Sequence, residues 1–184
     1  MTRSKLTTLT TAFMLMTTSQ LAFASSKAIT ESELQAAQEA WGQALISISE
    51  AYSKGGRENA EQTARAVLDA AYGYNLGPVL FKPTLANGEQ TFRTTYDGAL
   101  AYFVGGNSAF AGDSGFALKG WQGYEFNNAA VHMNGDLALT MGHVTLTNKD
   151  GSVTTVDKTW GFKKDEQGDL RIVLHHSSLP YSAE

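Results

Sequence analysis

The sequence predicts an α+β domain in which helices pack against one face of a curved antiparallel sheet. Two helix-like patterns come first, within residues 30–72, and four strand-like patterns follow from residue 119 onward. Turn sequences at 134–136, 149–151 and 165–169 separate the strands, and short turns of this kind join neighbours in an antiparallel meander. Because each helix has one apolar stripe to bury, this order favours helices that cover one face of the sheet.

Two amphipathic helices are expected at the start of the domain. Thr30 and Glu33 have the spacing of a capping box, and apolar residues then recur every three or four positions. This stripe comprises Leu34, Ala37, Trp41, Leu45, Ile48 and Tyr52. Gly55-Gly56 ends the first helix, and a second periodic pattern runs from about Asn59 to Tyr72.

The rest of the chain is predicted to alternate short elements with turns. Val79–Lys82 lies between two prolines and is expected to be a strand or an extended segment beside the core. The stretch from Thr95 to Val104 predicts a short helix that Gly105-Gly106 closes. The four strands of the meander are expected at about 119–133, 137–147, 153–163 and 170–178.

The first residues are typical of a secretory signal peptide. Arg3 and Lys5 precede an apolar, Thr-rich run that closes with Ala22-Phe23-Ala24, a cleavage site of the Ala-x-Ala kind. A transmembrane anchor is the competing interpretation, but the run contains many hydroxyl side chains. We therefore expect a signal peptide at residues 1–24, a single domain at 25–184, and a periplasmic or secreted protein with no membrane attachment after cleavage.

Charge and cysteine content exclude several classes of function. The formal net charge is −4, and removal of Arg3 and Lys5 makes the remaining chain more acidic, which argues against nucleic acid or anionic lipid as a partner. The chain has no cysteine. A thiol nucleophile, a thiolate zinc site and stabilising disulfides are therefore excluded.

The last predicted strand ends in two histidines and two serines. Alternation along a strand puts Val173, His175 and Ser177 on one side, and Leu174, His176 and Ser178 on the other. The two histidines thus point in opposite directions and cannot share one metal ion without a bulge. A zinc site needs three convergent ligands, and the other histidines, His132 and His143, lie on different predicted strands. We expect no metal and no other cofactor.

The element order resembles the NTF2-like superfamily, which includes the association domain of calcium/calmodulin-dependent kinase. The terminal His175-His176-Ser177-Ser178 stretch, on the last strand of such a domain, is similar to the iota class of carbonic anhydrases. The signature of that class is three histidines followed by two serines, and here Leu174 occupies the first histidine position. The resemblance covers roughly residues 25–184 and implies reversible hydration of carbon dioxide to bicarbonate.

The resemblance also implies a set of site residues. It places Thr84 of "LFKPTLANG", Tyr102 of "GALAYFVGG", His175 and Ser177 in one pocket. Alternation independently puts His175 and Ser177 on the same side of their strand. Structural roles remain open for each residue: Thr84 as the start of a turn, Tyr102 as a core aromatic residue, and Ser177 as a cap of the strand end.

The expected chemistry follows from these side chains. Hydroxyls of Thr84, Tyr102 and Ser177 would bind bicarbonate oxygens and orient a water molecule, and His175 would accept or relay its proton. An apolar wall for carbon dioxide is expected from Phe81, Phe103 and Val173. Metal-free and metal-dependent accounts both exist for the iota class, and the hydroxyl-rich pocket favours the metal-free one.

Two other functions remain open at this level. One is a non-catalytic association or small-molecule binding domain, since the NTF2-like fold hosts many activities. The other is an isomerase or cyclase that uses a carboxylate base in the same cavity, with Asp97 and Glu125 as candidates. The resemblance further implies a homodimer formed through the outer face of the sheet.

Overall fold

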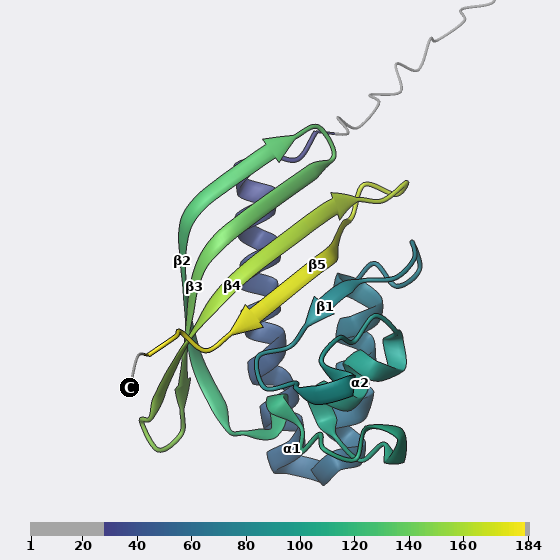
Figure 1. Cartoon of the computed structure of the whole chain (residues 1–184), viewed down its shortest axis with the longest axis vertical. Coiled ribbons are helices and arrows are strands. Elements are labelled where there is room, and N and C mark those ends of the chain that lie inside the picture. The colour runs from purple at the N-terminus through teal and green to yellow at the C-terminus, as the bar shows by residue number, and fades with distance from the viewer. Residues whose placement is uncertain (1–27, 183–184) are drawn as a thin grey trace, which may run out of the picture.

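The computed structural model describes residues 28–182, so the predicted signal peptide at 1–24 lies outside the described residues. Two helices and a five-stranded sheet form the domain (Figure 1), and three short 3₁₀ turns connect them. The elements are α1 (Glu31–Ala71), β1 (Leu80–Lys82), α2 (Tyr96–Val104), β2 (Trp121–Asn134), β3 (Leu137–Asn148), β4 (Val153–Lys164) and β5 (Leu170–Ser178). This arrangement confirms the predicted α+β class and its order of elements.

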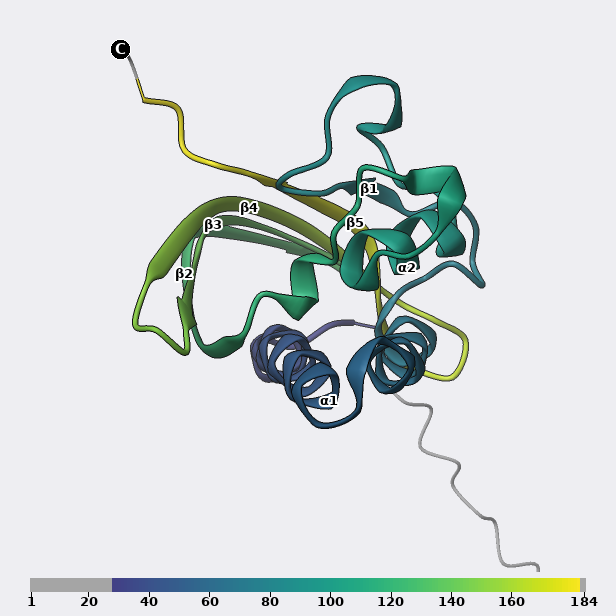
Figure 2. The same ribbon diagram turned by 90° about the horizontal axis from the view of Figure 1, so that it is seen from below.

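The helix α1 consists of two segments, as the sequence predicted. Its N-cap Thr30 and Glu33 form the expected capping box, with the Thr30 Oγ1 accepting from the Glu33 backbone N–H at 3.2 Å. Gly55 and Gly56 leave helical geometry, and Gly56 has φ +70°, a conformation that favours glycine. The chain reverses there, so the two segments lie side by side beneath the sheet (Figure 2). Within residues 28–182, no helix is long and apolar enough to cross a membrane.

The sheet has the strand order β1-β5-β4-β3-β2. Strands β2 to β5 form the predicted antiparallel meander, and their ends lie within two residues of the expected ones. The short strand β1 adds to the edge of β5 in parallel, with Phe81 beside His175. Figure 2 shows how the sheet curves over α1, and the buried apolar side chains of both layers form one core.

A β-bulge in the last strand corrects one sequence prediction. Gly161 pairs with Leu174 and Phe162 pairs with Ile172, so Val173 is an extra residue without a partner in β4. As a consequence Ile172 points into the core and is buried, whereas Val173 lines a surface cavity beside Gly73. The prediction that Val173 shares the face of His175 and belongs to the apolar wall is therefore wrong.

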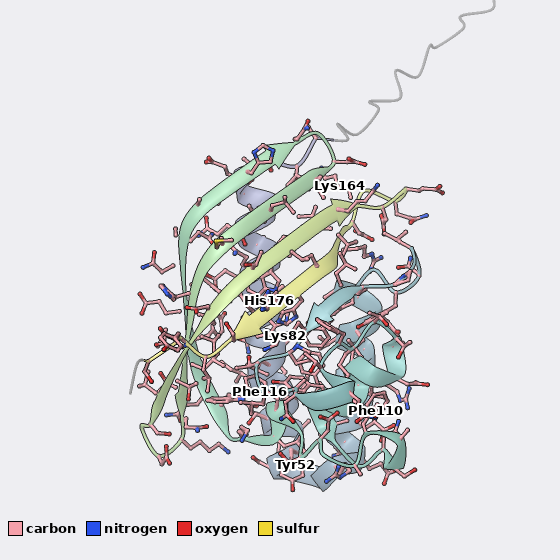
Figure 3. The ribbon with its side chains drawn as sticks, in the orientation of Figure 1. Tyr52, Lys82, Phe110, Phe116, Lys164 and His176 are labelled. Atoms are coloured by element: carbon pink, nitrogen blue, oxygen red, sulfur yellow. The ribbon has the colours of Figure 1, made fainter. Side chains whose placement is uncertain are left out.

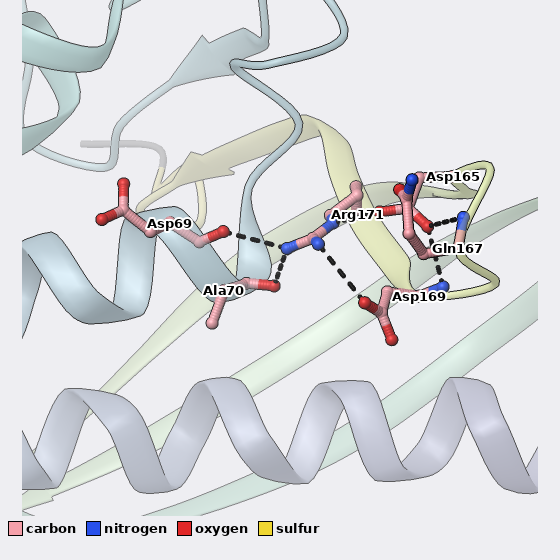
Figure 4. Close-up of polar contacts among 6 residues, drawn as sticks. All are labelled: Asp69, Ala70, Asp165, Gln167, Asp169 and Arg171. Carbon is pink, nitrogen blue, oxygen red and sulfur yellow. Dashed lines mark hydrogen bonds and ion pairs between the residues drawn. The ribbon is translucent and has the colours of Figure 1, made fainter.

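Arg171 connects the β4–β5 turn to the end of α1. Its Nε donates to Asp165 Oδ2 at 2.7 Å, its Nη2 lies 3.4 Å from Asp169 Oδ2, and its Nη1 donates to the backbone carbonyls of Asp69 and Ala70 (Figure 4). The last carbonyls of a helix have no partner within the helix, and a cation stabilises that end. The guanidinium also lowers the pKa of Asp165. Arg171 thus fixes the start of β5, and with it the register of the strand that carries the candidate site.

Candidate active site

The parallel pairing of β1 with β5 brings two predicted hydroxyls into contact. Thr84 lies two residues after the end of β1, and its Oγ1 is 2.5 Å from the Oγ of Ser177, which is on the inner face and only 1% exposed. Lys82 donates from Nζ to the backbone carbonyl of Ser177 at 3.1 Å. Lys82 also pairs with His176 in the register of the two strands, and Figure 3 shows the two side chains as neighbours.

The third hydroxyl comes from the short helix α2. Thr95 caps this helix by accepting from the Gly98 backbone N–H at 3.2 Å. Two turns later the buried Tyr102 accepts at Oη from the backbone N–H of Leu85 at 3.3 Å, next to Thr84 in the chain. Burial raises the pKa of Tyr102, partly opposed by hydrogen bonds from Leu85 and Thr84. The phenol therefore stays protonated at neutral pH and remains a hydrogen-bond donor.

His175 lies inside the core, on the same inner face as Ser177. Its ring stacks on Phe81 with centroids 4.4 Å apart, and its Nδ1 lies 2.8 Å from the Tyr72 Oη. Its pKa is well below the ordinary value, first because burial disfavours the charged imidazole, and then because a positive charge on Lys158 or His176 would repel it. The sequence-based assignment assumed an unperturbed imidazole pKa, and this environment does not provide one.

Sequence reasoning missed three residues around His175. Lys158 is 5% exposed, and its Nζ lies 2.6 Å from the His175 Nε2. Trp41 donates from Nε1 to the Tyr72 Oη at 3.0 Å. A signal for Lys158 was present in the sequence, because it occupies an inward position of β4 between Val156 and Trp160, where alternation demands an apolar side chain. Trp41 and Tyr72 gave none, since both fit the apolar stripes of the two predicted helices, although the structure ends α1 at Ala71, just before Tyr72.

Phe81 and Phe103 are core residues that pack beneath the hydroxyls. Both are buried, with ring centroids 5.9 Å apart, and the Phe81 ring meets the Tyr102 ring edge-on at 5.8 Å. A small cavity of about 40 Å³ adjoins this cluster. It is lined by Leu85, Tyr102, Gly112, Asp113, Ser114, Gly115, Phe116 and Lys119. Larger hollows of about 260 and 670 Å³ lie elsewhere on the surface, and Val173 is the one predicted site residue that lines any of them.

The candidate carboxylate bases and the other histidines lie outside this cluster. Asp97 and Glu125 are exposed. His132 is exposed as well, and His143 contacts Asp157 at 3.2 Å on the outer face of the sheet. Among residues 28–182, no three His, Cys, Asp or Glu side chains stand close enough together to hold a metal ion. The groups gathered at the inner face of β4 and β5 are therefore hydroxyls, an imidazole and an amine.

Comparison with known proteins gives consistent matches. The family model for metal-independent carbonic anhydrase matches residues 32–179. A metal-independent carbonic anhydrase from Nostoc sp. (strain PCC 7120 / SAG 25.82 / UTEX 2576) is 58% identical over 156 residues, which are 85% of this chain and 76% of the relative. The crystal structure of a cyanobacterial iota-carbonic anhydrase complexed with bicarbonate superposes with a TM-score of 0.85 at 57% identity, covering 86% of this chain and 97% of that one.

More distant structures share the fold alone. A calcium/calmodulin-dependent protein kinase II association domain from Xanthomonas campestris has a TM-score of 0.54 at 22% identity and covers 89% of this chain and 100% of its own. An NTF2-like protein of unknown function from Pseudomonas putida KT2440 has a TM-score of 0.51 at 18% identity, covering 84% and 89%. The predicted NTF2-like fold is thus confirmed. With a family model that spans most of its length and a relative of this identity, the chain belongs to the metal-independent carbonic anhydrase family.

Proposed function

We propose that the pocket formed by Thr84, Tyr102 and Ser177 catalyses the reversible hydration of carbon dioxide to bicarbonate. The observation that carries this proposal is the convergence of three hydroxyls from β1, α2 and β5 in a chain of this family. The structure at 57% identity was determined with bicarbonate, a planar anion whose oxygens accept hydrogen bonds from such hydroxyls. Of these three hydroxyl residues, Tyr102 lines the adjoining cavity of about 40 Å³.

The hydroxyls contribute position and electrostatic stabilisation. Ser177 and Thr84 share one hydrogen bond, so one of the two keeps a proton to donate to an oxygen of the reacting carbon. Tyr102 keeps its proton as well, because burial opposes the phenolate. Donors held in place in a site with little water stabilise negative charge as it develops on carbon dioxide, without reorganisation. The buried rings of Phe81 and Phe103 form the apolar floor below them.

The two other functions are not favoured. A kinase association domain shares the fold at 22% identity. A purely associating role would not require three buried or half-buried hydroxyls to converge on one place. An isomerase or cyclase would need a carboxylate base in a dry pocket, and both candidates, Asp97 and Glu125, are exposed to water.

Stopped-flow measurement of carbon dioxide hydration by the purified protein tests this function. We expect catalysis above the buffer rate, and we expect it to persist after treatment with a strong chelator, because the proposed groups act without a metal. Loss of activity on chelation that added zinc or manganese restores would contradict the metal-free pocket. A protein that is inert in both conditions would contradict the carbonic anhydrase function itself.

We propose that two copies of the chain associate through the outer face of the sheet. On this face Met141 is 61% exposed, and Leu139 lies two residues away on the same side of β3, in an apolar patch that a partner would cover. Met141→Lys is expected to yield monomers in size-exclusion chromatography with light scattering. Leu76→Lys, a change at an exposed apolar residue of a loop, is the matched control and should remain dimeric. A wild-type protein that elutes as a monomer would contradict the proposal.

We further propose export to the periplasm or the medium through the leader at residues 1–24. The basic start, the apolar run and the Ala22-Phe23-Ala24 site support this. Mass spectrometry of the protein recovered outside the cytoplasm should find Ser25 as its first residue. An intact leader on protein retained in the cytoplasm would argue against export.

A further inference from the structure

The hydrogen bonds around His175 determine where its proton resides. The Trp41 Nε1 can only donate, so the Tyr72 Oη accepts its hydrogen at 3.0 Å. The phenol proton then has the His175 Nδ1, at 2.8 Å, as its acceptor. A neutral imidazole that accepts at Nδ1 carries its hydrogen at Nε2. This nitrogen is 2.6 Å from the Lys158 Nζ, so the arrangement requires an amine with a free lone pair.

The surroundings of Lys158 agree with an uncharged amine at rest. No carboxylate among residues 28–182 forms an ion pair with Lys158, and burial lowers its pKa well below the ordinary value. The titratable groups around the Lys158–His175 pair are Tyr72 at the C-cap of α1, Tyr102 from α2, Lys82 from β1 and His176 from β5. The last two lie on the opposite face of the sheet, and any positive charge there disfavours a second cation inside.

The same surroundings can also hold a cation for a short time. The Nζ lies 4.3 Å from the ring centre of Trp41 and 5.0 Å from that of Trp160. Indole faces attract an ammonium group, most strongly where water is excluded. A charged Lys158 would donate to the His175 Nε2, and the imidazole would then carry its hydrogen at Nδ1, directed at Tyr72. The phenol hydrogen would lose its acceptor, a cost that keeps the uncharged arrangement dominant.

Lys158 also stands beside the hydroxyls. In the register of β4 and β5 it is the direct partner of Ser177, and both side chains are buried on the inner face. The Cβ atoms of such partners lie about 5 Å apart. The stem of Lys158 therefore starts next to Ser177 and reaches along the sheet to His175. The Lys158 amine and the His175 imidazole therefore lie next to the hydroxyls of Ser177 and Thr84 on the inner face of the sheet.

We propose that Lys158 and His175 together form the proton acceptor of the hydration reaction, with Lys158 holding the proton. This inference rests on the proposed carbonic anhydrase function. In the step, one O–H bond of water breaks while its oxygen forms a bond to the carbon of carbon dioxide, and bicarbonate results. The proton goes to the amine–imidazole pair, which then carries one positive charge. The pair returns the proton to solvent buffer before the next turnover.

The tautomer of His175 gives a test that does not depend on activity. We expect ¹⁵N NMR of the labelled protein to show the Nε2–H form at high pH and the Nδ1–H form at low pH. The His175 signals are identified as those that Lys158→Met shifts. The pH of the tautomer change should coincide with the acid limb of the hydration rate, because a protonated pair cannot accept the proton of water. A tautomer that stays the same across the active pH range would overturn the proposal.

Kinetics of Lys158 variants give the second test. Lys158→Met keeps an unbranched apolar stem between the two indoles, and we expect a folded protein whose kcat for hydration falls about 10²-fold, the usual contribution of a general base. Because the chain has no cysteine, Lys158→Cys can be unfolded, alkylated with bromoethylamine at that one site, and refolded. The restored amine should recover most of the rate, with an acid limb moved to lower pH by its weaker basicity.

The outcomes separate the possible roles. A folded Lys158→Met protein with wild-type kcat and an unchanged pH profile would overturn the role of Lys158. Unaltered Lys158→Cys refolded in parallel is the control for the procedure. If the alkylated protein regains its melting temperature but not its rate, Lys158 has a structural role only. A wild-type protein without any hydration activity would instead contradict the proposed function, and the NMR titration would still report the state of the pair.

Discussion

Ser177→Ala is expected to lower kcat/KM for carbon dioxide hydration by about 10²-fold, the usual effect of losing one preorganised donor to a developing oxyanion. The Oγ of Ser177 is buried and 2.5 Å from the Thr84 Oγ1, so its removal leaves Thr84 without its partner and the pocket without one donor. The measurement is stopped-flow hydration at several carbon dioxide concentrations. Rates at several concentrations distinguish a change in kcat from a change in substrate binding.

The neighbouring serine supplies the matched control. Ser178 follows Ser177 in β5 and points to the opposite face of the sheet, where it pairs with Asp157. Ser178→Ala makes the same chemical change one residue away and should keep the wild-type rate. Equal losses in both variants would show that the strand end tolerates no change and would remove the support for a catalytic Ser177. A Ser177→Ala protein with full activity would place the reacting group elsewhere.

Phe81→Ala is expected to lower the free energy of unfolding by about 3–5 kcal/mol, the range for a large aromatic side chain removed from a core. The Phe81 side chain is 1% exposed, and its ring contacts His175 at 4.4 Å and Phe103 at 5.9 Å between centroids. The cavity left by the ring would also free the imidazole of His175 from its stacking partner. Urea denaturation followed by far-ultraviolet circular dichroism measures the loss.

Phe92 allows the effect of burial to be isolated. Its side chain is 69% exposed in the loop between β1 and α2, and Phe92→Ala should change stability by less than about 0.5 kcal/mol. A loss of under 1 kcal/mol in Phe81→Ala would mean that the surrounding rings close over the gap, and that Phe81 is not the support of the site. Phe81→Leu, which keeps most of the apolar volume, should retain a folded protein for activity measurements.

Local patterns in the sequence determined the secondary structure. The Thr30 capping box, the glycine pair at Gly55-Gly56 and the three turns between the strands each act over a few residues, so the elements formed where expected. Alternation placed His175 and Ser177 on one face, and the β-bulge at Val173 did not disturb it because it lies before both residues. Three hydroxyls were identified through the family resemblance, and the structure brings them together.

Only the tertiary structure decided which groups surround His175. Trp41 comes from the first segment of α1, Tyr72 is the residue that follows its second segment, and Lys158 comes from β4. Lys158 and Tyr72 contact the imidazole from 17 and 103 positions away, and Trp41 holds Tyr72. The pKa of His175 follows from burial and from neighbouring charges, which no local pattern encodes. The sequence by itself determined the positions of the helices and strands, the shared face of His175 and Ser177 in β5, and the identity of the three hydroxyl residues. The parallel pairing of β1 with β5 and the packing of α1 under the sheet determined the site, because burial and proximity exist only after the chain has folded.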